Sequence, residues 1–176
     1  MKNLKNICKV FVGVVSVLSA SLRIAVLPAY ALSGTYNYAS SGSYYSEYGP
    51  TSYWHTTTNA GYCGHISSSC SPNSMRWTYS NGCSVSNQAQ WDNINSAQNG
   101  IHKVFIPGTN ATTTNAPYTV TYNGASSYSW SINQNNYYDA WVQTGTFYDI
   151  RNTWLTDATC EGGSPKVGFD EVRIIY

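Results

Sequence analysis

The stretch SYSWSINQNNYYDAWVQTGTFYDI, residues 127–150, decides the fold class. In its first third, Tyr128, Trp130 and Ile132 alternate with serines, a period of two that places aromatic and hydroxyl side chains on opposite faces of a strand. The bend at residues 135–139 (NNYYD) carries turn-forming residues, and a second strand-like run follows over residues 141–150. The stretch therefore predicts an aromatic-rich β-hairpin.

Shorter runs of the same character occupy much of the remaining chain. They predict further strands at residues 74–80, 88–93, 100–107, 116–122 and 166–176, separated by turn formers such as Asn81-Gly82 and Asn123-Gly124. No segment sustains the 3.6-residue period of an amphipathic helix. We expect an all-β fold, a jelly-roll-like antiparallel β-sandwich of about seven to nine strands stapled by disulfides.

Residues 1–31 have the features of a secretory signal peptide. A basic start with three lysines precedes an uncharged run at residues 10–22, of which residues 10–20 are apolar, and Ala29-Tyr30-Ala31 has the small-x-small form that a signal peptidase accepts. A membrane anchor is the alternative, but the uncharged run is shorter than the roughly 20 residues that span a bilayer. We expect a secreted, extracellular protein that starts near Leu32 and is not held in a membrane after cleavage.

The remaining chain divides by composition into two parts. Residues 32–52 are rich in Tyr and Ser and poor in aliphatic side chains, so they predict a lead that is either flexible or packed as an edge on the sandwich. Residues 53–176 are expected to form the β-sandwich domain, with order from about Tyr53 onward.

Charge excludes several classes of partner. Four of the nine Lys and Arg residues lie in the predicted signal peptide, so five basic residues remain against eight acidic ones. Those five are scattered along the chain. Because nucleic acids and anionic membrane surfaces need a basic patch, we expect neither as a partner.

The cysteines outside the signal peptide form an even set: Cys63, Cys70, Cys83 and Cys160. In an exported chain such a set predicts two disulfides, and we favour Cys63–Cys70 and Cys83–Cys160 among the three possible pairings. Zinc held by Cys63, His65 and Cys70 is the alternative, although the spacing lacks the paired form of known structural sites.

From about Gln88 onward the chain resembles the golvesin C-terminal / xanthan-lyase carbohydrate-binding-like domain family. GIHKVFIPGT at residues 100–109 and APYTVTYNG at residues 116–124 are similar to two of its strands. The family's Gln, then Trp, then Leu-Gly-Thr-Phe arrangement is matched by Gln134, Trp141, Gly145, Thr146 and Phe147. GFDEVRIIY resembles its closing strand through Asp170, Val172 and Arg173.

The chain also departs from the family pattern. Thr144 stands where the family has Leu, and Phe169 and Glu171 replace small residues beside Asp170. The resemblance implies a non-catalytic β-sandwich of the kind appended to secreted enzymes that act on polysaccharide or peptidoglycan.

Candidate ligand-binding residues gather in and around the bend. Tyr137 and Tyr138, beside Asn135, are the best candidates for stacking on a sugar ring, because aromatic faces suit the C–H-rich faces of pyranoses. Trp130 and Trp141 are candidates for the same platform, with the sandwich core as the favoured alternative. Gln134 either lines a ligand groove or, as we favour, makes structural hydrogen bonds, with Asp170 as one partner.

No set of residues predicts catalysis or a metal site. A glycosidase needs two facing carboxylates, and none of the eight acidic residues has a recognisable acid/base setting. A calcium ion with Asp157 or Glu161 among its ligands is allowed but not indicated, and no cofactor or metal is predicted. We expect a secreted, non-catalytic module that binds polysaccharide or cell-envelope glycan. The alternatives are a structural or adhesive matrix protein, in which the Tyr/Ser-rich lead makes the contacts, and a secreted hydrolase or lyase.

Overall fold

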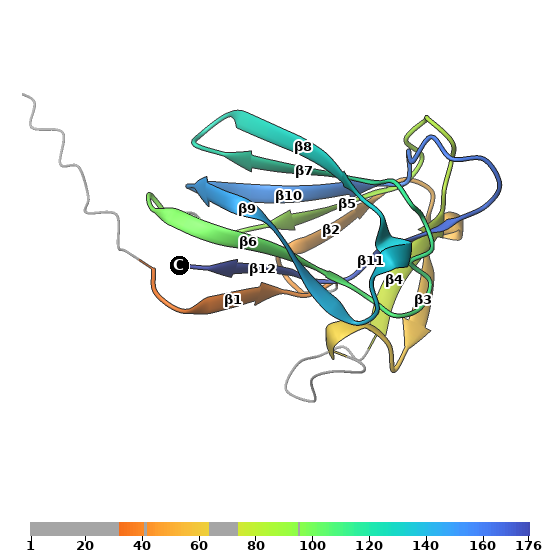
Figure 1. Cartoon of the computed structure of the whole chain (residues 1–176), viewed down its shortest axis with the longest axis horizontal. Helices are drawn as coiled ribbons and strands as arrows, with labels where there is room; N and C mark the ends of the chain where they lie inside the picture. The colour runs from red at the N-terminus through yellow and green to blue at the C-terminus, as the bar shows by residue number, and fades with distance from the viewer. Residues whose placement is uncertain (1–31, 41, 64–73, 95) are drawn as a thin grey trace, which may run out of the picture.

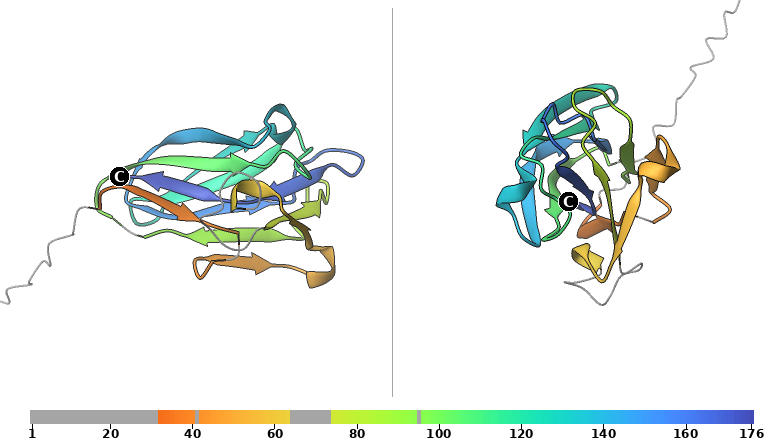
Figure 2. Two further views of the ribbon diagram at one scale, coloured as in Figure 1. Left: turned by 90° about the horizontal axis from the view of Figure 1, so that it is seen from below. Right: turned by 90° about the vertical axis from the view of Figure 1, so that its right-hand side faces the viewer.

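The computed structural model describes residues 32–40, 42–63, 74–94 and 96–176 (Figure 1). These residues form an all-β structure in which every strand pairing is antiparallel, as predicted. Two larger sheets pack face to face as a sandwich, and a smaller sheet stands at one end (Figures 1 and 2).

The first large sheet has four strands in the order β1-β12-β6-β9. Its strands are β1 (Thr35–Tyr38), β12 (Val172–Ile175), β6 (Asn99–Ile106) and β9 (Ala140–Tyr148). A register shift between His102 and Lys103 marks a bulge in the pairing of β6 with β9. Val104, Ile106 and Ile174 point from this sheet into the core.

The second large sheet has five strands in the order β2-β5-β10-β7-β8. Its strands are β2 (Tyr45–Tyr48), β5 (Gln88–Asp92), β10 (Ile150–Thr156), β7 (Ala116–Tyr122) and β8 (Ser126–Ile132). Trp91, Leu155 and Val120 are buried on its inner face, and they alternate with polar residues that face solvent.

The small sheet has the order β11-β4-β3 and closes one end of the sandwich, at the right of Figure 1. Its strands are β11 (Lys166–Phe169), β4 (Ser74–Tyr79) and β3 (His55–Thr58), and the 3-10 helix η1 (Thr51–Tyr53) precedes β3. Phe169 contributes to the main core. Its ring meets the Trp54 ring in an edge-to-face arrangement, with 4.8 Å between the ring centres. This sheet therefore belongs to the same folded unit as the sandwich.

The predicted hairpin over residues 127–150 is wrong, although both of its strands exist. β8 pairs with β7 and β9 pairs with β6, so the chain crosses from one sheet to the other through the 3-10 helix η3 (Gln134–Asn136). The hairpin is instead β7–β8, closed at Asn123 and Gly124, which both have positive φ. Alternation of side chains reveals a strand but not its partner.

Residues 32–40 and 42–52 pack on the sandwich, and their strands β1 and β2 are edge strands of the two large sheets, which is the second of the two alternatives for the lead. β1 pairs with β12 and β2 with β5, which raises the number of strands in the described ranges to twelve. Burial of aromatic rings stabilises this arrangement, since Tyr38 is buried with its hydroxyl bonded by the Ile94 N–H, and Tyr45 packs on Trp91 at 5.3 Å. The Tyr side chains thus replace the missing aliphatic residues.

His102 lies in the core, fully buried. Its two ring nitrogens share hydrogen bonds with the hydroxyls of Thr144 and Thr153, and burial lowers its pKa to about 3, so it is neutral. Thr144 is one of the departures from the family pattern. Its hydroxyl pairs with Nδ1 of the buried imidazole, a ring nitrogen that Leu at this position would leave unpaired.

The Cys83–Cys160 disulfide is present as predicted. Cys70 and His65 lie outside the described residues, so the Cys63–Cys70 pairing and the zinc alternative stay untested predictions. The predicted signal peptide also lies outside them. Within the described part of the chain, no helix is long and apolar enough to cross a membrane.

Candidate functional site

The residues predicted to bind ligand do not form one site. Gln134 has 0% of its surface exposed and is a core residue, which corrects its candidacy as a ligand contact. Its side-chain amide donates to the hydroxyl of Tyr118 and the carbonyl of Gly168, and it accepts from the Gly168 N–H, all at 2.9–3.0 Å. The expected structural role is therefore present, but with these partners in place of Asp170.

The two tryptophans lie on different sheets. Trp130 is stacked between Tyr118 and Tyr128 on the inward side of β8, each 5.8 Å away. Trp141 lies on β9, where the Arg173 guanidinium is 3.8 Å from the centre of its ring and Phe105 packs edge-on at 5.3 Å. Both rings are half-buried among protein side chains, so they do not share a platform with the bend.

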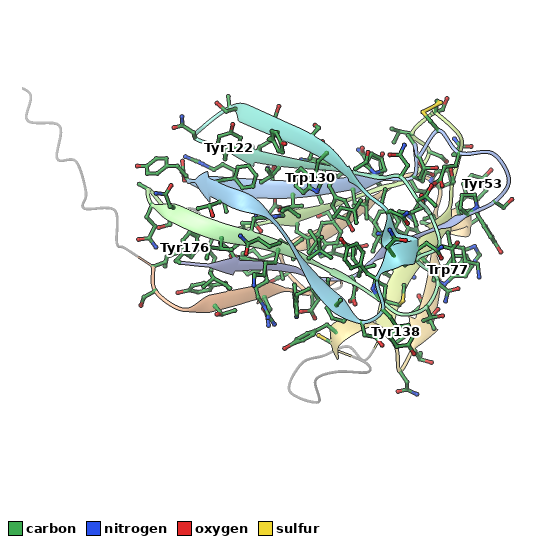
Figure 3. All side chains as sticks on the ribbon, viewed as in Figure 1. Tyr53, Trp77, Tyr122, Trp130, Tyr138 and Tyr176 are labelled. Atoms are coloured by element: carbon green, nitrogen blue, oxygen red, sulfur yellow. A yellow bond between two sulfur atoms is a disulfide. The ribbon has the colours of Figure 1, made fainter. Side chains whose placement is uncertain are left out.

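The bend itself is exposed. Asn135, Tyr137 and Tyr138 all face solvent, and Tyr138 is 73% exposed. Figure 3 labels Tyr138. The Tyr138 ring borders a hollow of about 190 Å³ that also includes Asn59, Gly61, Thr109 and Asp139. The Asp139 carboxylate accepts a hydrogen bond from the Gly108 N–H at 2.8 Å and so fixes this end of the bend.

Two buried carboxyl groups lie near the same hollow. Asp170 accepts a hydrogen bond from the Tyr62 N–H at 2.7 Å, and its carboxylate lies so close to Gly61 that a Cβ there would be 2.4 Å from it. Burial raises the pKa of Asp170 well above its usual value and the pKa of Glu171 to about 7. The neighbourhood of the bend therefore concentrates acidic groups.

A second pocket, which we call the end pocket, is the better candidate site. It has a volume of about 240 Å³ and lies beside the small sheet. Its lining residues are Tyr53, His55, Tyr79, Ser80, Asn81, Ser86 and Asp157. Figure 3 shows Tyr53 and Trp77 at the same end of the molecule, and the right-hand view of Figure 2 looks onto that end.

Aromatic rings form one wall of the end pocket. β3 pairs with β4 so that His55 is opposite Trp77, and the two rings stack at 4.1 Å. The Tyr79 ring stands edge-on to both, at 5.7 Å from His55 and 5.2 Å from Trp77. Although supported in this way, Tyr79 keeps 47% of its surface exposed and Tyr53 keeps 56%. Exposed rings that are held in place lose little conformational entropy when they bind a ligand.

Lys166 supports the same wall from β11. Its ammonium group lies 4.5 Å from the centre of the Trp77 ring and donates to the Asn110 side-chain oxygen at 2.8 Å. The Trp77 indole N–H donates to the Thr57 hydroxyl at 3.0 Å. The wall is thus fixed by a cation–π contact and hydrogen bonds from three strands and a loop.

The opposite side of the end pocket is polar. The buried Asp157 carboxylate accepts hydrogen bonds from the N–H groups of Ser86 and Asn87, at 2.8 and 2.9 Å. Burial raises the pKa of Asp157, and these two hydrogen bonds oppose the increase. Asp157 therefore organises the loop that carries Ser86, and Ser86 and Asn81 both line the pocket. The Ser86 hydroxyl donates to the Asn87 side-chain oxygen and the Asn81 side-chain amide to the Ser84 carbonyl, so these groups are held in place within the protein.

The disulfide lies next to this polar side. Cys83 belongs to the loop between β4 and β5, and Cys160 to the loop between β10 and β11. The Asn81 N–H donates to the Asp157 carbonyl at 3.0 Å, and the Cys160 N–H donates to the Gly82 carbonyl at 2.8 Å. Covalent and hydrogen bonds together hold the two loops that carry the polar groups of the pocket.

Gly49 allows the remaining side of the pocket to close. Its φ is +102°, and a Cβ at this position would lie 2.2 Å from the carbonyl oxygen of Ser86. Only glycine permits this close approach, which brings η1 and Tyr53 beside the Ser86 loop.

Sequence reasoning missed the end pocket because its residues come from four separate segments of the chain. Tyr53 and Asp157 are distant in sequence from Tyr79 and Ser86, and the folded sheets bring them together. The local signals were Tyr53 and Tyr79, each at the end of a short polar run, and the Cys83–Cys160 pair, which joins the loop between β4 and β5 to the loop between β10 and β11.

Glu161, the other carboxylate named as a possible calcium ligand, is also used within the protein. It accepts hydrogen bonds from the hydroxyl groups of Thr113 and Thr114 and from the Thr114 N–H. In the ranges that the structure describes, no group of three or more His, Cys, Asp or Glu side chains is arranged to hold a metal ion.

Comparisons with known proteins identify the fold. No protein-family model matches the sequence, and curated proteins give no match. The solved structure of a Paenibacillus xanthan lyase matches 80% of this chain with a TM-score of 0.57 and 18% identity, and the matched region is 13% of that chain. The C-terminal CBM6 of LamC, a marine laminarinase from Zobellia galactanivorans, matches 81% of this chain and all of that chain, with a TM-score of 0.47 and 12% identity.

The likeness to the xanthan lyase shows a shared β-sandwich fold. This fold agrees with the xanthan-lyase part of the resemblance seen in the sequence. The resemblance to golvesin domains stays a prediction, because no family model matches the chain.

Proposed function

We propose that the protein is a secreted, non-catalytic module that binds a polysaccharide or cell-envelope glycan, and that the end pocket holds a sugar ring. One observation carries this proposal: exposed aromatic rings of Tyr53 and Tyr79 lie in one open pocket with the uncharged polar groups of Ser86 and Asn81. Aromatic faces pack on the C–H groups of a pyranose, and hydroxyl and amide groups bond to its hydroxyls.

The acidic groups support a binding role without catalysis. Glycosidases use two carboxyl groups that face each other across the bond to be broken. Asp157 is the one acidic residue among those that line the end pocket, and its two oxygens accept backbone hydrogen bonds.

Deletion of the Tyr/Ser-rich lead would not be a clean test of the adhesive alternative. β1 is paired in the four-stranded sheet and β2 in the five-stranded sheet. Removal of residues 32–50 would therefore damage the fold along with any contact surface. Replacement of the exposed Tyr44 by Ser tests adhesion through the lead without this complication.

The proposal is tested by affinity electrophoresis of the purified protein through gels that contain a panel of polysaccharides. We expect at least one polymer to retard the protein, and we expect the Tyr53→Ala/Tyr79→Ala variant to bind it at least tenfold more weakly, which corresponds to about 1.4 kcal/mol. Tyr138→Ala is the matched control, because it removes an equally large exposed ring outside the pocket. Retardation by none of the polymers, or loss of binding only in the control, would contradict the proposal.

A further inference from the structure

We propose that the outer face of the five-stranded sheet, which we call the polar face, is a second binding surface, and that it takes an extended, uncharged polysaccharide lying across the strands. The inner neighbours Trp91, Leu155 and Val120 are buried, so the residues between them along β5, β10 and β7 point outward. This inference draws its ligand class from the side chains of the polar face, and it does not depend on the end pocket.

A continuous row of side chains crosses the polar face from one edge to the other. Register pairs Ser46 with Gln90, Gln90 with Trp154, Trp154 with Thr119, and Thr119 with Ser129. With neighbouring strands about 4.8 Å apart, this row is roughly 19 Å long. A row of that length suits several consecutive sugar rings better than a small molecule.

An aromatic pair lies at the centre of the polar face. Trp154, on the middle strand, stacks with Tyr48 at 5.7 Å and an interplanar angle of 30°. Its indole N–H donates to the Asn152 side-chain oxygen at 3.1 Å, and the Tyr48 hydroxyl donates to the Gln90 side-chain oxygen at 3.0 Å. Because these contacts hold both rings on the solvent side of the sheet, their apolar surface is available to a ligand and is not needed for the core.

A second row, beside the first, borders a hollow of about 570 Å³. It consists of Asp92, Asn152, Thr121 and Ser127, and the first three line the hollow. Asn152 accepts a hydrogen bond from the Thr121 hydroxyl as well as the one from Trp154. The polar side chains of this face are thus ordered by one another before any ligand binds.

The charge of the polar face selects an uncharged polyhydroxylated ligand. Asp92 is the one ionisable acidic or basic side chain in the two rows, whereas the outer face of the four-stranded sheet carries Lys103 and Arg173. Arg151 lines the hollow, but its guanidinium is paired with the Asp149 carboxylate at 2.7 Å, so an anionic polymer would meet no unpaired basic group in the two rows or the hollow. Serine is depleted from the centres of protein–protein interfaces, and the two rows include three serines, so a protein partner fits less well.

Variants in the two regions separate this proposal from the end pocket. In the Tyr53→Ala/Tyr79→Ala background, we expect gels containing galactomannan or hydroxyethylcellulose to retard the protein still. Addition of Trp154→Ala should weaken that retention at least tenfold, and addition of Ser129→Lys should weaken it at least threefold. Thr35→Lys is the matched control, since it adds the same charge to an exposed position on an edge strand of the other sheet.

The proposal is overturned if retention is the same with and without Trp154→Ala and Ser129→Lys. It is also overturned if the Tyr53→Ala/Tyr79→Ala background alone abolishes retention by both neutral polymers, or if only the anionic polymer xanthan retards the protein. Thermal unfolding of each variant, with a midpoint within a few degrees of the parent, shows that a loss of retention is a loss of binding. Ser129→Lys keeps the test valid if Trp154→Ala fails to fold, because Ser129 is exposed on the edge strand β8.

Discussion

The end pocket and the bend both present tyrosines to solvent, but they differ in what lies behind the rings. In the end pocket, Tyr79 is supported by the stacked rings of His55 and Trp77, and those in turn by Lys166. In the bend, Tyr138 lies against the backbone at Gly108, beside a group of acidic side chains. A run of exposed aromatic residues in the sequence is therefore weaker evidence of a site than rings fixed by several strands.

The largest expected effect concerns the covalent link beside the end pocket. Cys83→Ser/Cys160→Ser should lower the free energy of unfolding by about 4.5 kcal/mol, because the bond closes a loop with a sequence separation of 77. Chemical denaturation of the variant and the parent measures the difference. Ligand binding should also weaken, since the loops that carry Asn81 and Asp157 are released. Unchanged stability would show that the disulfide does not fix these loops.

Removal of the amide that anchors the bend comes next. Gln134→Leu keeps the volume but leaves the Tyr118 hydroxyl and both backbone groups of Gly168 without this partner, at an expected cost of about 3 kcal/mol. Gln143→Leu, at an exposed position on β9, is the control and should change stability by less than about 0.5 kcal/mol. Equal effects of the two substitutions would contradict the structural role of Gln134.

The acidic groups near the bend predict a dependence of stability on pH. The pKa of Glu171 is raised to about 7 in the folded protein, so the fold binds this proton more tightly than the unfolded chain does. The stabilisation is fully present below about pH 4.5 and is lost as the pH rises through about 7, by at most about 3 kcal/mol. Asp170 and Asp157, whose pKa values are also raised, contribute with the same sign.

Denaturation at pH 5 and pH 8 tests this dependence. Glu171→Gln should reduce the loss of stability between the two pH values. If the parent protein gained more stability than the Glu171→Gln variant on going from pH 5 to pH 8, the assignment to Glu171 would be wrong.

The smallest predicted effect concerns the support of the aromatic wall. Lys166→Met keeps the aliphatic stem but removes the charge over Trp77, and it should weaken ligand binding about twofold to threefold, with a stability loss of about 0.5–1 kcal/mol. Lys103→Met, on the four-stranded sheet, is the matched control. An equal effect of the two substitutions would mean that the wall does not depend on Lys166.

The fold class was predictable from the sequence, but the partners of the strands were not. Alternation correctly located β5 and β7 because each has one buried and one exposed face. It also located β6, which ends in a run of buried residues, and β8, in which Ile132 is the one buried residue. The C-terminal run was predicted as one strand, yet it divides at Asp170 and Glu171 into β11 and β12, which belong to different sheets. Strand pairing depends on contacts between distant segments, which local alternation does not record.

β10 shows most clearly why local patterns were insufficient. It is the central strand of the five-stranded sheet, but the local pattern predicts a strand only as far as Ile150 and gives no assignment for residues 151–156. Asp149 has positive φ and turns the chain from β9 to β10, a turn that contains no glycine or proline to signal it. With β10 unassigned, Trp154 could not be placed, and neither the polar face nor the end pocket could be recognised.

The most direct test of the account is calorimetric titration of a polysaccharide that retards the protein into the parent protein, Tyr79→Ala and Tyr138→Ala. The account predicts that Tyr79→Ala binds at least tenfold more weakly and that Tyr138→Ala stays within twofold of the parent. The reverse result, with Tyr138→Ala impaired and Tyr79→Ala unaffected, would place the sugar site on the bend and contradict the assignment to the end pocket.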